Sequence, residues 1–123
     1  MAEVTVDFVA RDQPHGGWSL VLVEHGPWHC DDVSEHLRRI QERLYTCLDA
    51  ALDGAVAAQF PESRDKPLVI RVDAYNVAAD QLRAFFRNFS QQVPLLPDYA
   101  RALSAREFFP SVSFELNVRD LQP

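Results

Sequence analysis

Three of the four histidines lie in one short stretch that also holds a cysteine and several acidic residues. The stretch reads Glu24-His-Gly-Pro-Trp-His-Cys-Asp-Asp32, and His36 follows it. Imidazole, thiolate and carboxylate groups are the usual zinc ligands, but neither C-x-x-C nor H-E-x-x-H spacing occurs here. The stretch is therefore either a small-molecule or metal site around His25, His29, Cys30 and His36, or a connecting turn before a capped helix.

The two cysteines, Cys30 and Cys47, raise the questions of a reactive thiol and of a disulfide bridge. A thiol at a helix N-terminus can act as a nucleophile, but we expect the adjacent carboxylates of Asp31 and Asp32 to oppose this effect at Cys30. If both cysteines lie on or beside one helix, they are roughly 25 Å apart, too far for a disulfide. We expect no bridge, and we name no catalytic residue, cofactor or metal ligand.

The composition excludes several classes of protein. The 123 residues are 47% hydrophobic and 24% charged, with a formal net charge of −6, which indicates one globular domain over residues 1–123. The acidic balance disfavours nucleic acid. Arg83 and Arg87 are spaced to share one helix face that is solvated or binds an acidic group. No apolar run nears the roughly 18 residues of a membrane span, and the acidic start differs from a signal peptide. We expect a cytoplasmic protein.

Alternating and helical patterns predict six elements. Residues 4–8, 18–25, 68–74 and 112–118 alternate or are apolar like strands. Residues 32–53 carry an apolar stripe, with capping-box spacing from Asp32 to Glu35 and a C-terminal glycine at Gly54. Asn76 is placed to cap a second helix that ends near Val93.

This order predicts an α+β fold: a two-layer β-β-α-β-α-β sandwich, with a four-stranded mixed sheet and two helices on one face. The other face is then open. It is expected to carry polar side chains and, in its middle, an apolar strip of Val21 and Val23; the polar residues are Thr5, Asp7, Arg71, Asp73, Ser113, Glu115, Asn117 and Arg119.

Residues 94–110 form an unusually long connection between a helix and a strand. A short helix at residues 98–108 would have Tyr99, Leu103 and Phe108 as its apolar side. The segment either closes the end of the core or makes a contact with another subunit. Exposed apolar patches mark partner sites, so we predict a homodimer that uses either Val21 and Val23 or this segment.

Part of the chain resembles a family of small bacterial domains of unknown function. It reads Glu24-His-x-x-Trp28 and then His36-Leu-x-x-Ile-Gln-x-Arg-Leu44, where the family reads Asp-His-Leu-x-Trp and His-Leu-x-x-Leu-Gln-x-Lys-Leu-Asn-x-Tyr. Tyr45 and Cys47 depart from that pattern, and residues 94–110 look like an insertion. The resemblance brings no activity, but it implies a shared surface at His25, Trp28, His36 and Gln41.

Two functions remain after these observations. The first is a small binding or regulatory module that acts through protein–protein contacts, without catalysis. The alternative is a small-molecule or metal-binding enzyme with its site around His25, His29, Cys30 and His36. The sequence names neither a partner nor a substrate.

Overall fold

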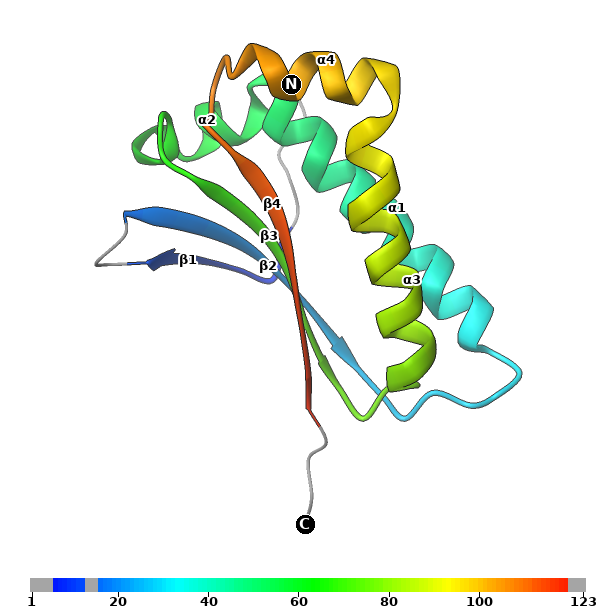
Figure 1. Cartoon of the computed structure of the whole chain (residues 1–123). Coiled ribbons are helices and arrows are strands. Elements are labelled where there is room, and N and C mark those ends of the chain that lie inside the picture. Colours follow the sequence, from blue (N-terminus) through cyan, green and yellow to red (C-terminus); the bar gives the residue numbers. More distant parts are fainter. Residues whose placement is uncertain (1–5, 13–15, 120–123) are drawn as a thin grey trace.

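The computed structural model describes residues 6–12 and 16–119 of the chain. A four-stranded sheet forms one layer and the helices form the other, which is the expected α+β arrangement (Figure 1). The strands are β1 (Phe8–Asp12), β2 (Gly17–His25), β3 (Leu68–Tyr75) and β4 (Val112–Arg119). The helices are α1 (Val33–Asp53), α2 (Ala55–Gln59), η1 (Pro61–Ser63), α3 (Ala79–Gln92), η2 (Val93–Leu95) and α4 (Pro97–Ala105).

The sheet is mixed and its strands lie side by side in chain order, β1-β2-β3-β4. β1 runs antiparallel to β2, whereas β2, β3 and β4 are parallel. His25 pairs with Tyr75 and Tyr75 pairs with Arg119, so the three parallel strands end together. Because the two crossovers run in the same direction, α1 and α3 cover the same face of the sheet (Figure 1). No helix among the described residues is long and apolar enough to cross a membrane.

The core lies between the sheet and the two long helices. In β3 every second residue is buried, and the stripe of α1 is buried at Ile40, Leu44, Cys47 and Leu48. These positions follow the periods of two and 3.6 that the sequence shows. The centre of the core consists of fully buried aliphatic side chains, among them Leu20, Leu22, Leu68, Ile70, Val72, Leu82 and Val56.

The end of α1 is confirmed and its predicted capping box is wrong. Gly54 adopts the left-handed conformation with φ of 95°, as a C-terminal glycine does. A Cβ at this position would also lie 2.8 Å from the ring of Phe108. At the other end, Asp32 Oδ1 accepts a hydrogen bond from the backbone N–H of His29 at 2.8 Å, which lies before the helix rather than inside it.

The first strand begins later than predicted, and Asp7 faces the opposite side of the sheet from the one predicted. β1 starts at Phe8, so Val6 and Asp7 precede it, and residues 4 and 5 lie outside the described part. Arg43 of α1 donates to the Asp7 carboxylate at 3.0 Å, which places Asp7 on the helix side and not on the open face. Asn76 was also predicted wrongly as a cap, since it has φ of 57° and α3 begins at Ala79.

The predicted exposed strip on the open face is wrong at its centre. Val21 has 0% exposed surface, although its side chain lies on the sheet face opposite the helices. Its strand is flanked on both sides, and the register places Val21 between Phe8 of β1 and Arg71 of β3. Val23 is half-buried. Val21 therefore has no exposed surface to offer a second subunit.

Residues 94–110 close one end of the core. They contain the last two residues of η2 and all of α4, so most of the segment is helical. Tyr99 donates to Asp49 Oδ1 at 2.7 Å and its ring lies against Tyr45 at 6.0 Å between centroids. Phe109 is buried, and Phe108 packs beside Gly54. The predicted apolar side of this segment thus packs on α1 of its own chain.

Candidate functional site

The predicted histidine cluster is separated in space into two ring pairs. His25 ends β2 and its ring stacks on Tyr75 of β3, with centroids 5.5 Å apart. His36 lies in α1 and stacks on Trp28, with centroids 4.7 Å apart and planes 7° apart. Within residues 6–12 and 16–119, no three His, Cys, Asp or Glu side chains come together in a way that can hold a metal ion.

His36 joins the Trp28 stack to a chain of charged groups. Its Nδ1 is 3.0 Å from Arg39 Nη1, and its Nε2 is 3.4 Å from Asp32 Oδ1. Arginine only donates hydrogen bonds, so Nδ1 accepts and the neutral ring carries its proton on Nε2, facing Asp32. The stacked ring is therefore fixed by a donor on one side and a carboxylate on the other.

Glu24 is the centre of that charged network. Its side chain is 5% exposed, on the helix-covered face near the end of β2. Arg39 donates to Oε2 at 2.6 Å, and Arg43 donates to Oε1 at 3.3 Å. A buried carboxylate is costly unless it is paired and hydrogen-bonded. The two arginines of α1 therefore offset the cost of burying Glu24.

Asp7 extends the network to the first strand. Its Oδ2 accepts from the backbone N–H of Val23 at 2.7 Å and from Arg43 at 3.0 Å. Burial alone would raise the pKa of Asp7, but these two donors outweigh burial and lower the pKa below its ordinary value. Asp7 is thus held as an anion, and it ties β1 and β2 to α1.

The remaining predicted site residues lie apart on the surface. His29, Cys30 and Gln41 are exposed, as are Arg83 and Arg87 on α3. Cys47 is buried in the core, where desolvation raises the pKa of its thiol to about 11. Both cysteines are free. The structure therefore brings Trp28 and His36 together but leaves His25, His29, Cys30 and Gln41 without a common centre.

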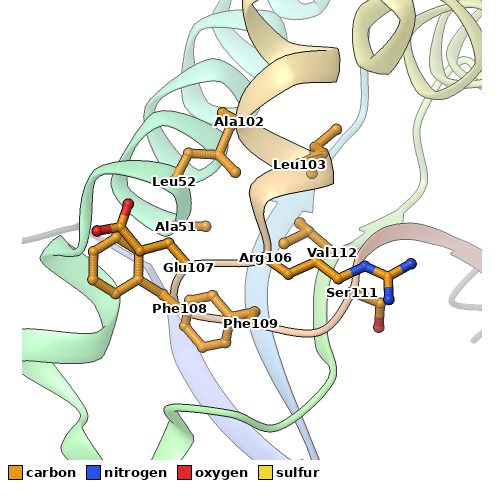
Figure 2. A pocket seen from close by; sticks show the side chains of 10 residues that line it. All are labelled: Ala51, Leu52, Ala102, Leu103, Arg106, Glu107, Phe108, Phe109, Ser111 and Val112. Atoms are coloured by element: carbon orange, nitrogen blue, oxygen red, sulfur yellow. The ribbon is translucent and has the colours of Figure 1, made fainter.

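A small cavity lies under α4 (Figure 2). Side chains of α1, α4 and residues 106–112 surround it, including Leu52, Leu103, Phe108 and Phe109. Its volume is about 20 Å³, which is about the space of one water molecule. This cavity is a packing gap and not a substrate site.

A wider groove lies between α1 and α4 and is acidic. It has a volume of about 400 Å³, and its lining includes Asp49, Asp53, Asp98 and Tyr99. Desolvation and the hydrogen bond to Asp49 raise the pKa of the Tyr99 hydroxyl, so this hydroxyl stays protonated and serves to hold α4 on α1. Nearby, Leu95 is 71% exposed and Leu96 is 45% exposed.

The open face of the sheet carries a polar pocket near the ends of the parallel strands. Its volume is about 200 Å³, and it is lined by Arg71, Asp73, Tyr75, Asn117 and Arg119. Arg71 Nε lies 3.1 Å from Asp73 Oδ1, and Asn117 Nδ2 donates to the same oxygen at 3.1 Å. Arg119 is exposed and forms no ion pair with any described residue. This pocket, hereafter the Arg119 pocket, has two guanidinium groups and one carboxylate.

The edge of the sheet at β4 is unpaired among the described strands (Figure 1). Leu68 donates to the carbonyl of Ser111 at 3.0 Å, and Asn76 donates to that of Arg119 at 3.1 Å. Odd-numbered residues of β4 thus direct their N–H and C=O groups to β3. Because these directions alternate along a strand, the even-numbered residues point theirs outward; they are Val112, Phe114, Leu116 and Val118.

Sequence reasoning missed both the Glu24 network and the free edge. The sequence predicts no role for Arg39, and Arg43 enters only as part of the family-like motif that ends at Leu44. The available indication was Glu24 itself, an acid directly after the apolar run Leu20–Val23, with two arginines four residues apart on the next helix. The free edge had no comparable indication, because alternation does not reveal which strand lies outermost.

Comparison with protein-family models, with curated proteins and with solved structures finds no match to this chain. The resemblance to a family of small bacterial domains therefore stays a prediction.

Proposed function

We propose that this chain is a small cytoplasmic binding or regulatory module that acts through protein–protein contacts, without catalysis, and that associates with itself. The observation that carries this proposal is the free edge of β4. Its outward N–H and C=O groups have no partner strand among the described residues, and its apolar side chains are only half-buried.

β4 has few of the features that protect an edge strand. Natural edges are kept from pairing by prolines, lysines, bulges or short length. β4 is eight residues long and contains neither proline nor lysine, and its register with β3 is continuous from Leu68–Val112 to Tyr75–Arg119. A strand from another molecule can therefore pair along it.

The side chains of β4 favour the same conclusion. All four of its apolar residues face the helix layer, yet each is only half-buried within the chain, including Phe114, which contacts Phe86 and Phe89 of α3. The equivalent residues of the inner strand β3 are fully buried. An added strand would cover the exposed part of β4 as β4 covers β3.

The geometry gives less support to the enzyme alternative. A catalytic or metal site needs its groups within hydrogen-bonding or ligand distance of one another. His25 and His36 instead stack on different aromatic partners, and His29 and Cys30 lie exposed in the connection before α1. We therefore propose binding rather than chemistry.

The test is the oligomeric state of a matched pair of variants. Val118→Pro removes an outward N–H, while Val118→Ala keeps it and also shortens the side chain. Sedimentation at micromolar concentrations should show a species of twice 14.0 kDa for the wild type and Val118→Ala, and a monomer for Val118→Pro. A wild type that stays at 14.0 kDa at every concentration removes the proposal.

A further inference from the structure

We infer that the partner at the β4 edge is a second copy of this chain, paired antiparallel about a twofold axis at Asn117, and that its Glu115 completes the Arg119 pocket. This inference rests on the self-association proposed above and adds the register and the residue that the second copy contributes.

The outward backbone groups restrict the possible registers. In an antiparallel pair, residues that point their N–H and C=O groups at the partner strand lie opposite one another. Those residues are the even-numbered ones, so even positions oppose even and odd positions oppose odd. The open-face row Ser113, Glu115, Asn117 and Arg119 of one copy therefore faces the same row of the other.

The charges of that row select one register. A twofold axis at Asn117 places Glu115 of each copy opposite Arg119 of the other, which makes two ion pairs. An axis at Glu115 would place two carboxylates opposite each other, which is destabilising. An axis at Leu116 would place Glu115 opposite Asn117 and leave both charges without an opposite charge directly across. Only the axis at Asn117 pairs each charge with its opposite.

The Arg119 pocket has the charge that this register requires. Asp73 is already engaged by Arg71 and by the amide of Asn117. Arg119 stays exposed at the outer strand, with no ion-pair partner among the described residues. A carboxylate from across the edge balances the second guanidinium of the pocket.

The helix side of the strand fits the same pairing. With the axis at Asn117, Leu116 of each copy lies opposite Val118 of the other. Both side chains are half-buried in the single chain. Apolar pairs directly across a strand pair stabilise it, so one register satisfies the polar face and the apolar face together.

A charge-reversal cycle tests the ion pairs. Glu115→Arg and Arg119→Glu each place like charges opposite each other twice per dimer, and each should weaken the dimer by at least about tenfold. The double variant exchanges the charges and should regain the wild-type affinity within about threefold. Glu42→Arg is the matched control, because it makes the same charge change at an exposed position of α1 and should leave the affinity unchanged.

Disulfide trapping tests the axis independently. In a Cys30→Ser background, Asn117→Cys places two thiols opposite each other across the axis, within the Cα separation that a disulfide needs. Mild oxidation should yield a covalent dimer. Glu115→Cys in the same background should yield far less, because its thiol faces Arg119 of the second copy.

The outcomes separate this inference from the proposed function. If the wild type dimerises and Val118→Pro abolishes the dimer, but the charge variants have no effect and Glu115→Cys is trapped instead, the edge is the contact and our register is wrong. If the single-charge variants fold with wild-type melting curves and the double variant does not recover, the ion pairs are wrong. If the wild type is monomeric, both proposals fall.

Discussion

The guanidinium of Arg39 lies 2.6 Å from the carboxylate of Glu24 across the interface between α1 and the sheet. The Glu24 side chain is 5% exposed, whereas that of Arg39 is 47% exposed. A solvated cation thus neutralises a buried anion, and the contact joins the first residue of the histidine-rich stretch to a residue that follows it.

The two arginines that hold Glu24 should act non-additively. Arg39→Ala or Arg43→Ala alone leaves one guanidinium at Glu24, so each should reduce the free energy of unfolding by about 1 kcal/mol. The double variant leaves the buried carboxylate unpaired and should cost about 3–5 kcal/mol. Urea unfolding measures all three. Adding Glu24→Gln to the double variant should recover much of the loss, and an additive double variant without this recovery would contradict the role of Glu24.

The stability contributed by Asp7 should disappear in acid. The folded-state pKa of Asp7 is lowered, while the ordinary value is 3.8, so folding favours the ionised form. This contribution is fully present above about pH 4 and is lost as the pH falls through the folded-state pKa. The difference in melting temperature between the wild type and Asp7→Asn should be constant from pH 5 to pH 8 and shrink below pH 4. A difference in melting temperature that grows below pH 4 would show that folding raises the pKa of Asp7 instead of lowering it.

Gly26 should not tolerate a side chain. A Cβ at this position would overlap the carbonyl oxygen of Asn76, a backbone atom that cannot give way cheaply. Gly16 offers a matched comparison, since its Cβ would meet nothing within 4 Å and its φ is +70°. Gly16→Ala should cost only about 1 kcal/mol of conformational strain, and Gly26→Ala should cost clearly more. Thermal melting of the two variants decides the order.

The two cysteines should differ sharply in reactivity. Cys30 is exposed, whereas burial raises the pKa of Cys47 to about 11, and the thiolate is the reactive form. In the native protein at pH 8, dithionitrobenzoate should titrate one thiol quickly, and Cys30→Ser should remove that reaction. Two thiols should react in denaturant. Fast modification of both in the native state would mean that the α1 core opens readily.

Substitutions in the buried apolar stripe of α1 should reduce the free energy of unfolding far more than substitutions on its exposed face. Leu44 is 0% exposed, so Leu44→Ala should cost about 2–5 kcal/mol through lost packing and a cavity. Gln41 is one turn away on the same helix and exposed, so Gln41→Ala should change the free energy of unfolding by at most about 0.5 kcal/mol. Denaturant titrations compare the two directly. A large loss from Gln41→Ala would instead indicate a contact on that face.

Local patterns determine most of the elements of this protein. The apolar residues repeat with the period of a helix from Ile40 to Ala51 and with the period of a strand from Val112 to Val118. Within each element, this pattern alone indicates which side is buried. The helix end at Gly54 is equally local, because it needs only one residue in the left-handed conformation. For this reason the order of elements and the two-layer arrangement were predictable.

The side of the sheet to which each residue of β1 points depends on the register of β1 with β2. Side chains alternate with a period of two, so a shift of one residue moves all of them to the other face. The apolar residues Val4, Val6 and Phe8 suggested one phase, whereas the pairing with β2 begins at Phe8 and sends Asp7 to Arg43. The facing of these side chains is therefore determined by contacts with residues more than ten positions away in the sequence. A local pattern contains no information about such contacts.

The candidate sites were decided by the tertiary structure alone. The sequence predicts an exposed Val21 on the open face of the sheet, but in the structure this side chain is fully buried. His25 and His36 are near in sequence, yet they stack on different aromatic rings. His25 stacks on Tyr75 of the next strand, and His36 stacks on Trp28 of the preceding turn. Which strand is outermost, and hence that Glu115 and Arg119 lie at a free edge, follows from how the crossovers stack the strands and from no single segment.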